Sequence, residues 1–261
     1  MKKKQSKPRV LVFAGLGLNC EHETAASFAE CGAYADIAHL HDVLERPAML
    51  RRYEIIAIPG GFSYGDDTGS GKAYGKKVHT ILGKELEQFL ARDTLMIGIC
   101  NGFQILTHAG ILPGALVHND SHTYQCRWVD VVPKGKSPWF GDCQSLSIPI
   151  AHGEGKYVDS EERLDALLVR KHEGVLTYVQ GEVSTSQNLP YNPNGSMRDI
   201  AGVTNYQGRV LGLMPHPERG FFFTHRPDWT LLREHLIAEK KPLPRYADGR
   251  IIFENGVRYF S

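Results

Sequence analysis

The sequence lacks the features that mark several large classes of protein. No run approaches 18 apolar residues, so it predicts no membrane-spanning helix. Thirty Lys and Arg balance 29 Asp and Glu, so no bulk charge directs the chain toward nucleic acid or an acidic membrane. It contains no internal repeat and no low-complexity stretch. With 42% hydrophobic and 23% charged residues among 261, the composition is that of a globular chain with a sizeable core, and it excludes disorder, collagen and coiled coil.

The cysteines are few and show no pairing pattern. There are five, an odd number without Cys-x-x-Cys spacing, which argues against a disulfide framework or a cysteine zinc knuckle. We therefore expect reduced thiols in the cytoplasm, one of which carries chemistry. The five are Cys20, Cys31, Cys100, Cys126 and Cys143.

The N-terminus resembles a secretory signal only superficially. Three lysines at residues 2–4 precede an apolar run, but Pro8 and Arg9 interrupt the approach. Asn19 stands before Cys20, where a cleavage site needs a small residue. We expect a solvated basic tail that leads into a buried first strand.

In the first half of the chain, short apolar runs alternate with helix-length segments, the pattern of βαβ units on a parallel sheet. The predicted strands are 9–13, 35–40, 54–58 and 95–99, and the predicted helices are 21–31, 78–90 and 101–109. The second half has little predicted helix, only 229–238, and more strands: 114–117, 127–132, 145–149, 175–180, 200–204 and 210–214. The predicted fold class is α/β, with a mostly parallel central sheet, flanking helices and extra β segments in the second half.

The C-terminal segment predicts a small addition to this fold. Asp248-Gly249 and Asn255-Gly256 are dipeptides of hairpin turns, so we expect a β appendage after the helix at 229–238. No linker divides the chain. We expect a single domain over residues 1–261, with its core at about 9–223.

The strongest local motif is Gly-Ile-Cys-Asn-Gly at residues 98–102, between an apolar strand and a helix. It matches the nucleophile-elbow pattern, with Cys100 as the nucleophile. At a helix N-terminus, the helix dipole and the free N–H groups favour thiolate over thiol. The alternative is a buried cysteine in an ordinary strand-to-helix turn. The two flanking glycines favour the elbow.

A base for this nucleophile is offered by Met-Pro-His-Pro-Glu at residues 214–218. Two prolines enforce extended backbone, so His216 and Glu218 point to the same side. The carboxylate can then hold the orientation and tautomer of the imidazole. The motif follows the predicted strand 210–214, which places it at the same sheet edge as Cys100.

A glycine-rich loop at residues 59–67 follows the predicted strand 54–58. Its paired glycines leave backbone N–H groups accessible, which suits an oxyanion hole. The spacing of the glycines matches neither of two phosphate-binding motifs. A Walker A loop needs glycine where Asp66 stands and Ser or Thr where Ala73 stands, and a dinucleotide fingerprint needs Gly or Ala where Cys20 stands.

Together these motifs resemble the class I, triad-type glutamine amidotransferases. The elbow continues with Phe103 and Gln104, and the second motif contains Pro-His-Pro-Glu. Within that class, further segments resemble the family of glutaminase subunits of phosphoribosylformylglycinamidine synthases, which act in purine synthesis. These are Gly-Gly-Phe-Ser-Tyr-Gly-Asp at 60–66, Ala-His-Gly-Glu-Gly at 151–155 and Asn-Cys-Glu at 19–21.

The resemblance implies a flavodoxin-like fold and a role for each motif residue. Cys100 would attack the glutamine amide and form a thioester, His216 would transfer protons, and Glu218 would orient His216. The residues implied for the oxyanion hole and the glutamine pocket are Gly61, Phe62, Asn101, Gln104, Asn119 and Ser121. For Asn119, Ser121 and the loop at 152–155, a turn or capping role is an equal alternative.

The resemblance also implies partners. Glutamine is the expected substrate, and the expected partners are a large ATP-dependent synthetase subunit and a small bridging subunit. That complex converts formylglycinamide ribonucleotide to formylglycinamidine ribonucleotide. ATP and Mg²⁺ are expected on the synthetase, with no cofactor in this chain. Neither nucleic acid nor a membrane is an expected partner.

Two histidine pairs have the spacing of metal ligands, but no acidic residue or cysteine adjoins them in the sequence. We expect these histidines at the surface and no metal in this chain. They are His39, His41, His118 and His122.

Three other functions stay open at this point. They are the glutaminase subunit of a different amidotransferase, a cysteine hydrolase or peptidase on the same fold, and a catalytically silent binding module. Gln104 and the loop at 60–66 disfavour a peptidase. The intact set of Cys100, His216 and Glu218 disfavours a silent module.

Overall fold

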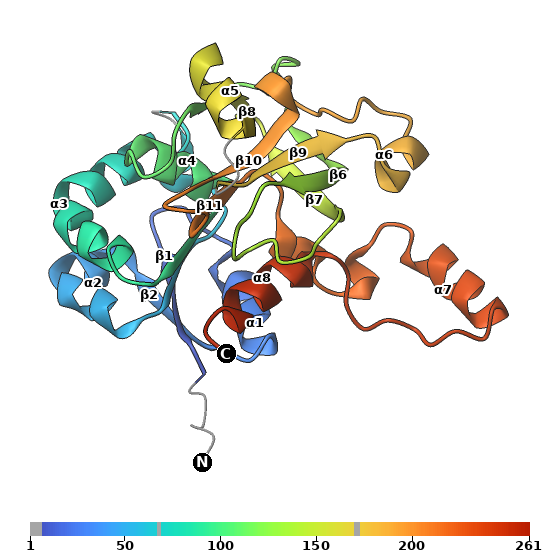
Figure 1. Cartoon of the computed structure of the whole chain (residues 1–261), viewed down its shortest axis with the longest axis horizontal. Helices are drawn as coiled ribbons and strands as arrows, with labels where there is room; N and C mark the ends of the chain where they lie inside the picture. Colours follow the sequence, from blue (N-terminus) through green and yellow to red (C-terminus); the bar gives the residue numbers. More distant parts are fainter. Residues whose placement is uncertain (1–6, 67–68, 170–172) are drawn as a thin grey trace.

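A nine-stranded mixed sheet forms the centre of the molecule, in the order β2-β1-β3-β4-β11-β10-β9-β6-β7 (Figure 1). The computed structural model describes residues 7–66, 69–169 and 173–261. The predicted tail at residues 2–4 and Asp67 of the glycine-rich loop lie outside the described residues.

Five neighbouring strands form the parallel half of the sheet. Strands β3, β4 and β11 are buried at every residue, as expected for parallel strands covered on both faces. The five are β2 (Tyr34–His39), β1 (Arg9–Ala14), β3 (Ile55–Ile58), β4 (Leu95–Ile99) and β11 (Val210–Leu213).

The strands of the second half continue the same sheet in antiparallel pairing. They are β10 (Ile200–Asn205), β9 (Val175–Val179), β6 (Gln125–Lys134) and β7 (Leu146–His152). Two short strands, β5 (Ala115–Val117) and β8 (Lys156–Val158), pair separately. The predicted α/β fold class is confirmed, and the extra β segments extend the central sheet.

Helices flank the parallel half. Helix α1 (Glu21–Glu30) packs with α8 (Gly249–Arg258), and α3 (Lys72–Leu90) packs with α4 (Asn101–His108). Figure 1 shows the two pairs on either side of β1. Further helices are α2 (Leu40–Glu45), α5 (Glu161–Val169) and α6 (Glu182–Ser186). The 3₁₀ turns are Pro47–Arg52, Ser63–Asp66, Met197–Asp199, Pro217–Gly220 and Phe223–His225.

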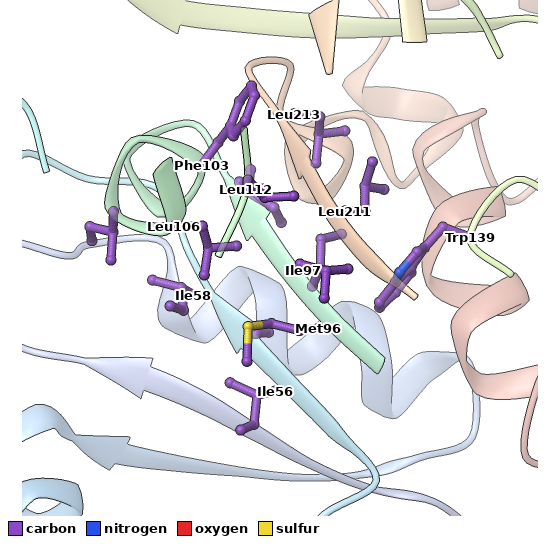
Figure 2. Close-up of a cluster of buried hydrophobic side chains, with 14 of the residues drawn as sticks. Ile56, Ile58, Met96, Ile97, Phe103, Leu106, Leu112, Trp139, Leu211 and Leu213 are labelled. Carbon is purple, nitrogen blue, oxygen red and sulfur yellow. The ribbon is translucent and has the colours of Figure 1, made fainter. Parts of the chain in front are cut away.

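Figure 2 shows one part of the apolar core, where α4 packs on β3, β4 and β11. Full burial of an aliphatic side chain stabilises the fold by about 1.5–3 kcal/mol, so this layer fixes the ends of β4 and β11 firmly. The labelled side chains are Ile56, Ile58, Met96, Ile97, Phe103, Leu106, Leu112, Trp139, Leu211 and Leu213.

The predicted β appendage at the C-terminus is wrong, because this segment is helix α8. Its residues at helical spacing, including Ile252 and Phe253, are buried, and the Phe253 ring meets Phe28 edge-on with centroids 4.9 Å apart. Asp248 accepts a hydrogen bond from the Ser147 N–H at 2.8 Å instead of forming a hairpin turn. Burial of one helix face thus outweighs the local turn preference of the Asp-Gly and Asn-Gly dipeptides.

Helix α7 (Trp229–Ala238), which the sequence predicts, extends away from the sheet on an arm (Figure 1). None of its residues is buried. The arm is closed at its base by a bridge between Phe222 and Tyr246. Within the described parts of the chain, no helix combines the length and the apolar character needed to cross a membrane.

Candidate active site

Cys100 occupies a strained turn between β4 and α4. Its backbone has φ 52° and ψ −106°, a region that non-glycine residues rarely adopt. A Cβ on Gly102 would lie 1.9 Å from the Ile58 carbonyl oxygen, and one on Gly98 would lie 2.6 Å from the Gly102 oxygen. The two glycines are therefore needed by close backbone approach, and the nucleophile-elbow geometry predicted for residues 98–102 is present.

The second motif reaches Cys100 through sheet register. Strand β11 pairs with β4 so that Leu213 lies opposite Ile99, and the Cys100 N–H donates to the Leu213 oxygen at 2.8 Å. The chain then continues directly into His216, whose N–H donates to the Pro149 oxygen at 2.7 Å. Two motifs far apart in sequence are thus joined by neighbouring strands.

His216 and Glu218 form a buried pair. The imidazole Nδ1 lies 2.6 Å from Glu218 Oε1, and the two side chains are 2% and 0% exposed. Burial lowers the pKa of His216, but the Glu218 carboxylate and the Cys100 thiol outweigh that effect and raise the pKa well above its ordinary value. A protonated imidazole beside a thiol stabilises the thiolate, which is the reactive form of a cysteine nucleophile.

The glycine-rich loop 60–66 is hydrogen-bonded to, and packs closely against, the turn that follows β1. The Phe62 N–H donates to the Gly17 oxygen at 2.9 Å, and a Cβ on Gly61 would lie 2.5 Å from that oxygen. The Phe62 N–H is therefore engaged, and of the two predicted loop donors Gly61 is the better candidate. Asn101 is the first residue of α4, where backbone N–H groups lack helical partners.

Gln104 lies on α4 beside Cys100, as predicted, but its side chain holds neighbouring segments together. Its Oε1 accepts from Asn101 Nδ2 at 2.8 Å, and its Nε2 donates to the Glu154 backbone oxygen at 2.6 Å. Asn101 Oδ1 in turn accepts from the Ser63 N–H at 3.1 Å. These contacts tie α4 to the glycine-rich loop and to the loop after β7.

Asn119 is fully buried and connects two loops. Its Nδ2 donates to the backbone oxygens of Thr123 and His152, each at 2.9 Å, while its Oδ1 accepts from the Gly155 N–H at 3.0 Å. These contacts identify Oδ1 as the acceptor facing His152 Nδ1, 3.1 Å away, so Nδ1 carries the imidazole proton. Burial, followed by the charge of His216, lowers the pKa of His152 to about 3.

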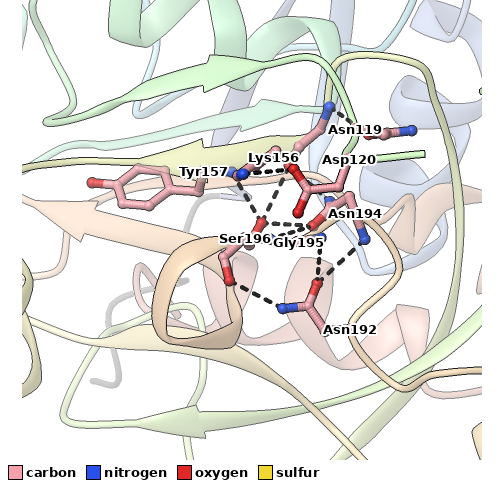
Figure 3. Close-up of polar contacts among 9 residues, drawn as sticks. Asn119, Asp120, Lys156, Tyr157, Asn192, Asn194, Gly195 and Ser196 are labelled. Atoms are coloured by element: carbon pink, nitrogen blue, oxygen red, sulfur yellow. Dashed lines mark hydrogen bonds and ion pairs between the residues drawn. The ribbon is translucent and has the colours of Figure 1, made fainter. Parts of the chain in front are cut away.

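The segment 192–196, which the sequence analysis does not single out, supports this loop (Figure 3). Asn194 Nδ2 donates to the Gly155 oxygen at 2.8 Å, and Ser196 Oγ accepts from the Tyr157 N–H at 2.9 Å. Asn and Ser in a loop are a common composition, so no distinctive signal marks them in the sequence.

Ser121 is exposed, and its Oγ accepts from Thr123 Oγ1 at 2.9 Å. The side-chain contacts of Ser121 stay within the turn at residues 121–125, whereas those of Asn119 also reach His152 and Gly155 in the loop after β7.

The four histidines of the two spaced pairs are exposed, as predicted. Within residues 7–66, 69–169 and 173–261, the one group of side chains close enough to hold a metal ion is Cys20, His216 and Glu218, whose donor atoms lie within 4.8 Å of one another. Its members already bind each other and Arg219, which donates from Nη2 to Cys20 Sγ at 2.9 Å. A second thiol, that of Cys20, thus lies beside the His216–Glu218 pair.

Comparison with known proteins agrees with this geometry. The family model of the CobB/CobQ-like glutamine amidotransferase domain matches residues 7–260, so the chain belongs to this family of glutamine amidotransferases. Its relatives include the phosphoribosylformylglycinamidine synthase subunit PurQ of Methanococcus maripaludis strain C5, 40% identical over 97% of this chain and 99% of its own length. The subunit of the same name from Dehalococcoides mccartyi is 36% identical over 97% of this chain and 98% of its own.

A solved structure, described as the structure of PurLQS from Thermotoga maritima, contains a chain of the same fold. That chain superposes with a TM-score of 0.69 at 32% identity, over 98% of this chain and 100% of its own length. The flavodoxin-like amidotransferase fold implied by the sequence resemblance is thus shared along the whole chain.

Proposed function

We propose that this chain is the glutaminase subunit of a phosphoribosylformylglycinamidine synthase. It hydrolyses glutamine to glutamate and ammonia, and the ammonia converts formylglycinamide ribonucleotide to formylglycinamidine ribonucleotide on a partner. One observation carries the proposal: an elbow cysteine stands beside a buried His–Glu pair in a chain 40% identical to a PurQ subunit over 97% of its length.

In this mechanism the Cys100 thiolate attacks the carboxamide carbon of glutamine. The negative charge that develops on the oxygen is held by the N–H groups of Gly61 and Asn101. His216 gives its proton to the departing nitrogen, so ammonia leaves and a γ-glutamyl thioester remains. Neutral His216 then takes a proton from water, which attacks the thioester. Collapse of that intermediate releases glutamate and regenerates the thiol.

The remaining predicted site residues support the pocket. Gln104 and Asn119 fix the loop at 152–155 over Cys100, whose Sγ lies 3.6 Å from the Ala151 oxygen. Phe62 and Tyr124, half exposed with ring centroids 6.3 Å apart, border the loop. We assign Ser121 to the outer rim. In this proposal the whole chain is one amidotransferase domain, with residues 9–223 as its core and α7 and α8 at its C-terminal end.

The partners in this proposal are a large synthetase subunit, which carries ATP and Mg²⁺, and a small bridging subunit. The relatives are named as subunits of a synthase, and the matched chain comes from a structure named PurLQS. We propose a cytoplasmic location, because all five cysteines are unpaired, which suits a reducing compartment.

The test is nitrogen-source dependence in the reconstituted complex. Cys100→Ala should abolish synthesis from glutamine and spare synthesis from added ammonium salt, because only thioester chemistry needs the thiol. Cys126→Ala, which alters an exposed thiol, is the matched control and should keep both activities. Equal loss with both nitrogen sources, in a variant that still assembles, would overturn the assignment. Glutamate release without synthesis in any condition would favour an independent hydrolase.

A further inference from the structure

A second thiol, Cys20, lies beside the imidazole of His216. Cys20 is fully buried at the N-terminal end of α1, and its N–H donates to the Gly60 oxygen at 3.2 Å. A Cβ on Gly60 would lie 2.6 Å from His216 Cε1 and 3.4 Å from Cys20 Sγ. The absence of a side chain at Gly60 therefore lets the sulfur and the ring edge approach each other.

The sulfur of Cys20 binds the guanidinium group of Arg219. It accepts a hydrogen bond from Arg219 Nη2 at 2.9 Å, and its thiol donates to Asn19 Oδ1 at 3.3 Å. The same guanidinium has its Nε 3.9 Å from Glu218 Oε1. Arg219 is thus held close to the sulfur and farther from the carboxylate.

The larger distance between Arg219 and Glu218 matters, because Glu218 Oε1 is also the atom bound by His216 Nδ1 at 2.6 Å. An unrestrained guanidinium closes on a carboxylate with two parallel, charge-assisted hydrogen bonds. If Arg219 moved onto Glu218, it would compete with His216 for Oε1. It would also neutralise the charge that stabilises the imidazolium.

We propose that Cys20 is a positioning residue of the triad, whose sulfur holds the Arg219 guanidinium away from Glu218 and so reserves the carboxylate for His216. The inference rests on the proposed function, because it takes Cys100, His216 and Glu218 as the working triad.

The electrostatics of the site agree with this arrangement. Burial lowers the pKa of His216, while Glu218, Cys100 and Cys20 raise it. Burial also lowers the pKa of Arg219, while the Cys20 sulfur and Glu218 raise it. The titratable and charged groups that interact with His216 or with its carboxylate are Cys20, Cys100, Tyr124, His152, Glu218 and Arg219.

The experiment measures how fast iodoacetamide alkylates Cys100 as a function of pH, with peptide mass mapping to separate Cys100 from Cys20. It uses the full chain as wild type, Cys20→Ala, Arg219→Gln and the double variant. In Cys20→Ala the midpoint of the curve of alkylation rate against pH should rise by about one pH unit, and the reaction at pH 7 should be up to tenfold slower. The reason is that His216 is then protonated less readily, so it stabilises the Cys100 thiolate less. In the Arg219→Gln background, Cys20→Ala should cause only a much smaller shift, that of the direct contact between Cys20 and His216.

Two more variants separate positioning from packing. Cys20→Ser should keep the wild-type midpoint, since a hydroxyl also accepts the hydrogen bond of Arg219. Cys31→Ala, which removes the half-buried thiol at the other end of α1, should leave the midpoint unchanged. If Cys20→Ala does not fold, as judged by thermal unfolding, Cys20→Val takes its place with the same expectation.

The inference is overturned if Cys20→Ala keeps the wild-type midpoint, if its full shift persists in the Arg219→Gln background, or if Cys20→Ser shifts the midpoint as far as Cys20→Ala does. A wild-type Cys100 that titrates like a free cysteine would instead overturn the triad itself, and with it the proposed function.

Discussion

The Nδ1 atom of His216 lies 2.6 Å from Oε1 of Glu218, and neither side chain has more than 2% of its surface exposed. The sequence predicts extended backbone here, but Pro217 and Glu218 begin the 3₁₀ turn Pro217–Gly220, and this turn brings the carboxylate back to the imidazole of His216. Since the pair is shielded from water, the charge on Glu218 acts on the imidazole with little screening.

Glu218→Gln should leave the fold intact and slow glutamine hydrolysis. An amide can hold the ring in the wrong tautomer and cannot stabilise the imidazolium. Loss of the orienting carboxylate costs about 10⁴ in the serine-protease template, and a thiol, which ionises more easily, should lose less. Steady-state glutamate release in the assembled complex measures the effect. Glu254→Gln, at a half-buried glutamate of α8 remote in sequence from Cys100, is the control. A wild-type rate in Glu218→Gln would reduce Glu218 to a structural role.

The free chain should be a poor glutaminase that its partner activates. The Phe62 N–H is bound to the Gly17 oxygen, so the turn after β1 holds the glycine-rich loop, and we expect docking of the partner to align the Gly61 N–H of that loop with the oxyanion. A missing oxyanion donor accounts for about 2.7–4 kcal/mol, or a hundred- to thousandfold in rate. Glutamate release should rise by that order when the synthetase and its substrates are added. A free chain that already turns over at the rate of the complex would contradict the coupling.

Gly102→Ala should destabilise the fold by at least about 1–3 kcal/mol, because the new Cβ would lie 1.9 Å from the Ile58 carbonyl oxygen, which belongs to backbone. Gly83→Ala is the matched control. Gly83 lies within α3, where an added Cβ meets no atom within 4 Å, so alanine should stabilise the helix by up to about 1 kcal/mol. Urea unfolding of the two variants should give shifts of opposite sign.

His152 should make the chain sensitive to acid. Its pKa falls from the ordinary 6.5 to about 3 on folding, so between these values the unfolded chain binds more protons and stability falls as pH falls. One such group contributes a slope of up to about 1.4 kcal/mol per pH unit. His152→Gln should flatten the dependence of unfolding free energy on pH between 4 and 6. An unchanged slope would show that His152 is protonated in the folded chain.

Helix α8 should contribute to global stability, whereas α7 should not. Phe253 is fully buried against Phe28, so Phe253→Ala should cost about 3–5 kcal/mol. Leu231 on α7 is 58% exposed, and Leu231→Ala should stay within about 0.5 kcal/mol. Chemical denaturation of both variants measures the difference. Similar values for the two would mean that the α1–α8 contact is loose in solution.

Local patterns were sufficient to predict the elbow at Cys100, the His216–Glu218 pair and the strands of the parallel half, because each depends on neighbouring residues. The C-terminal helix could not be predicted in this way, since its stability comes from burial against α1. Helix α5 buries only Leu164 and Leu167, so it leaves a weak apolar pattern. The Cys20–Arg219 contact joins residues 199 positions apart in the sequence, so it could not be predicted from periodicity or from motif spacing.

The pairing of β11 with β4 has a consequence for the order in which the protein is made. Cys100 is synthesised early, but β11 and His216 emerge from the ribosome only after more than a hundred further residues. Until then, β4 lacks its neighbour on one side and the thiol lacks its base. In the proposed mechanism, a nascent or prematurely terminated chain therefore carries Cys100 without its base, and glutamine is spared until His216 has been made.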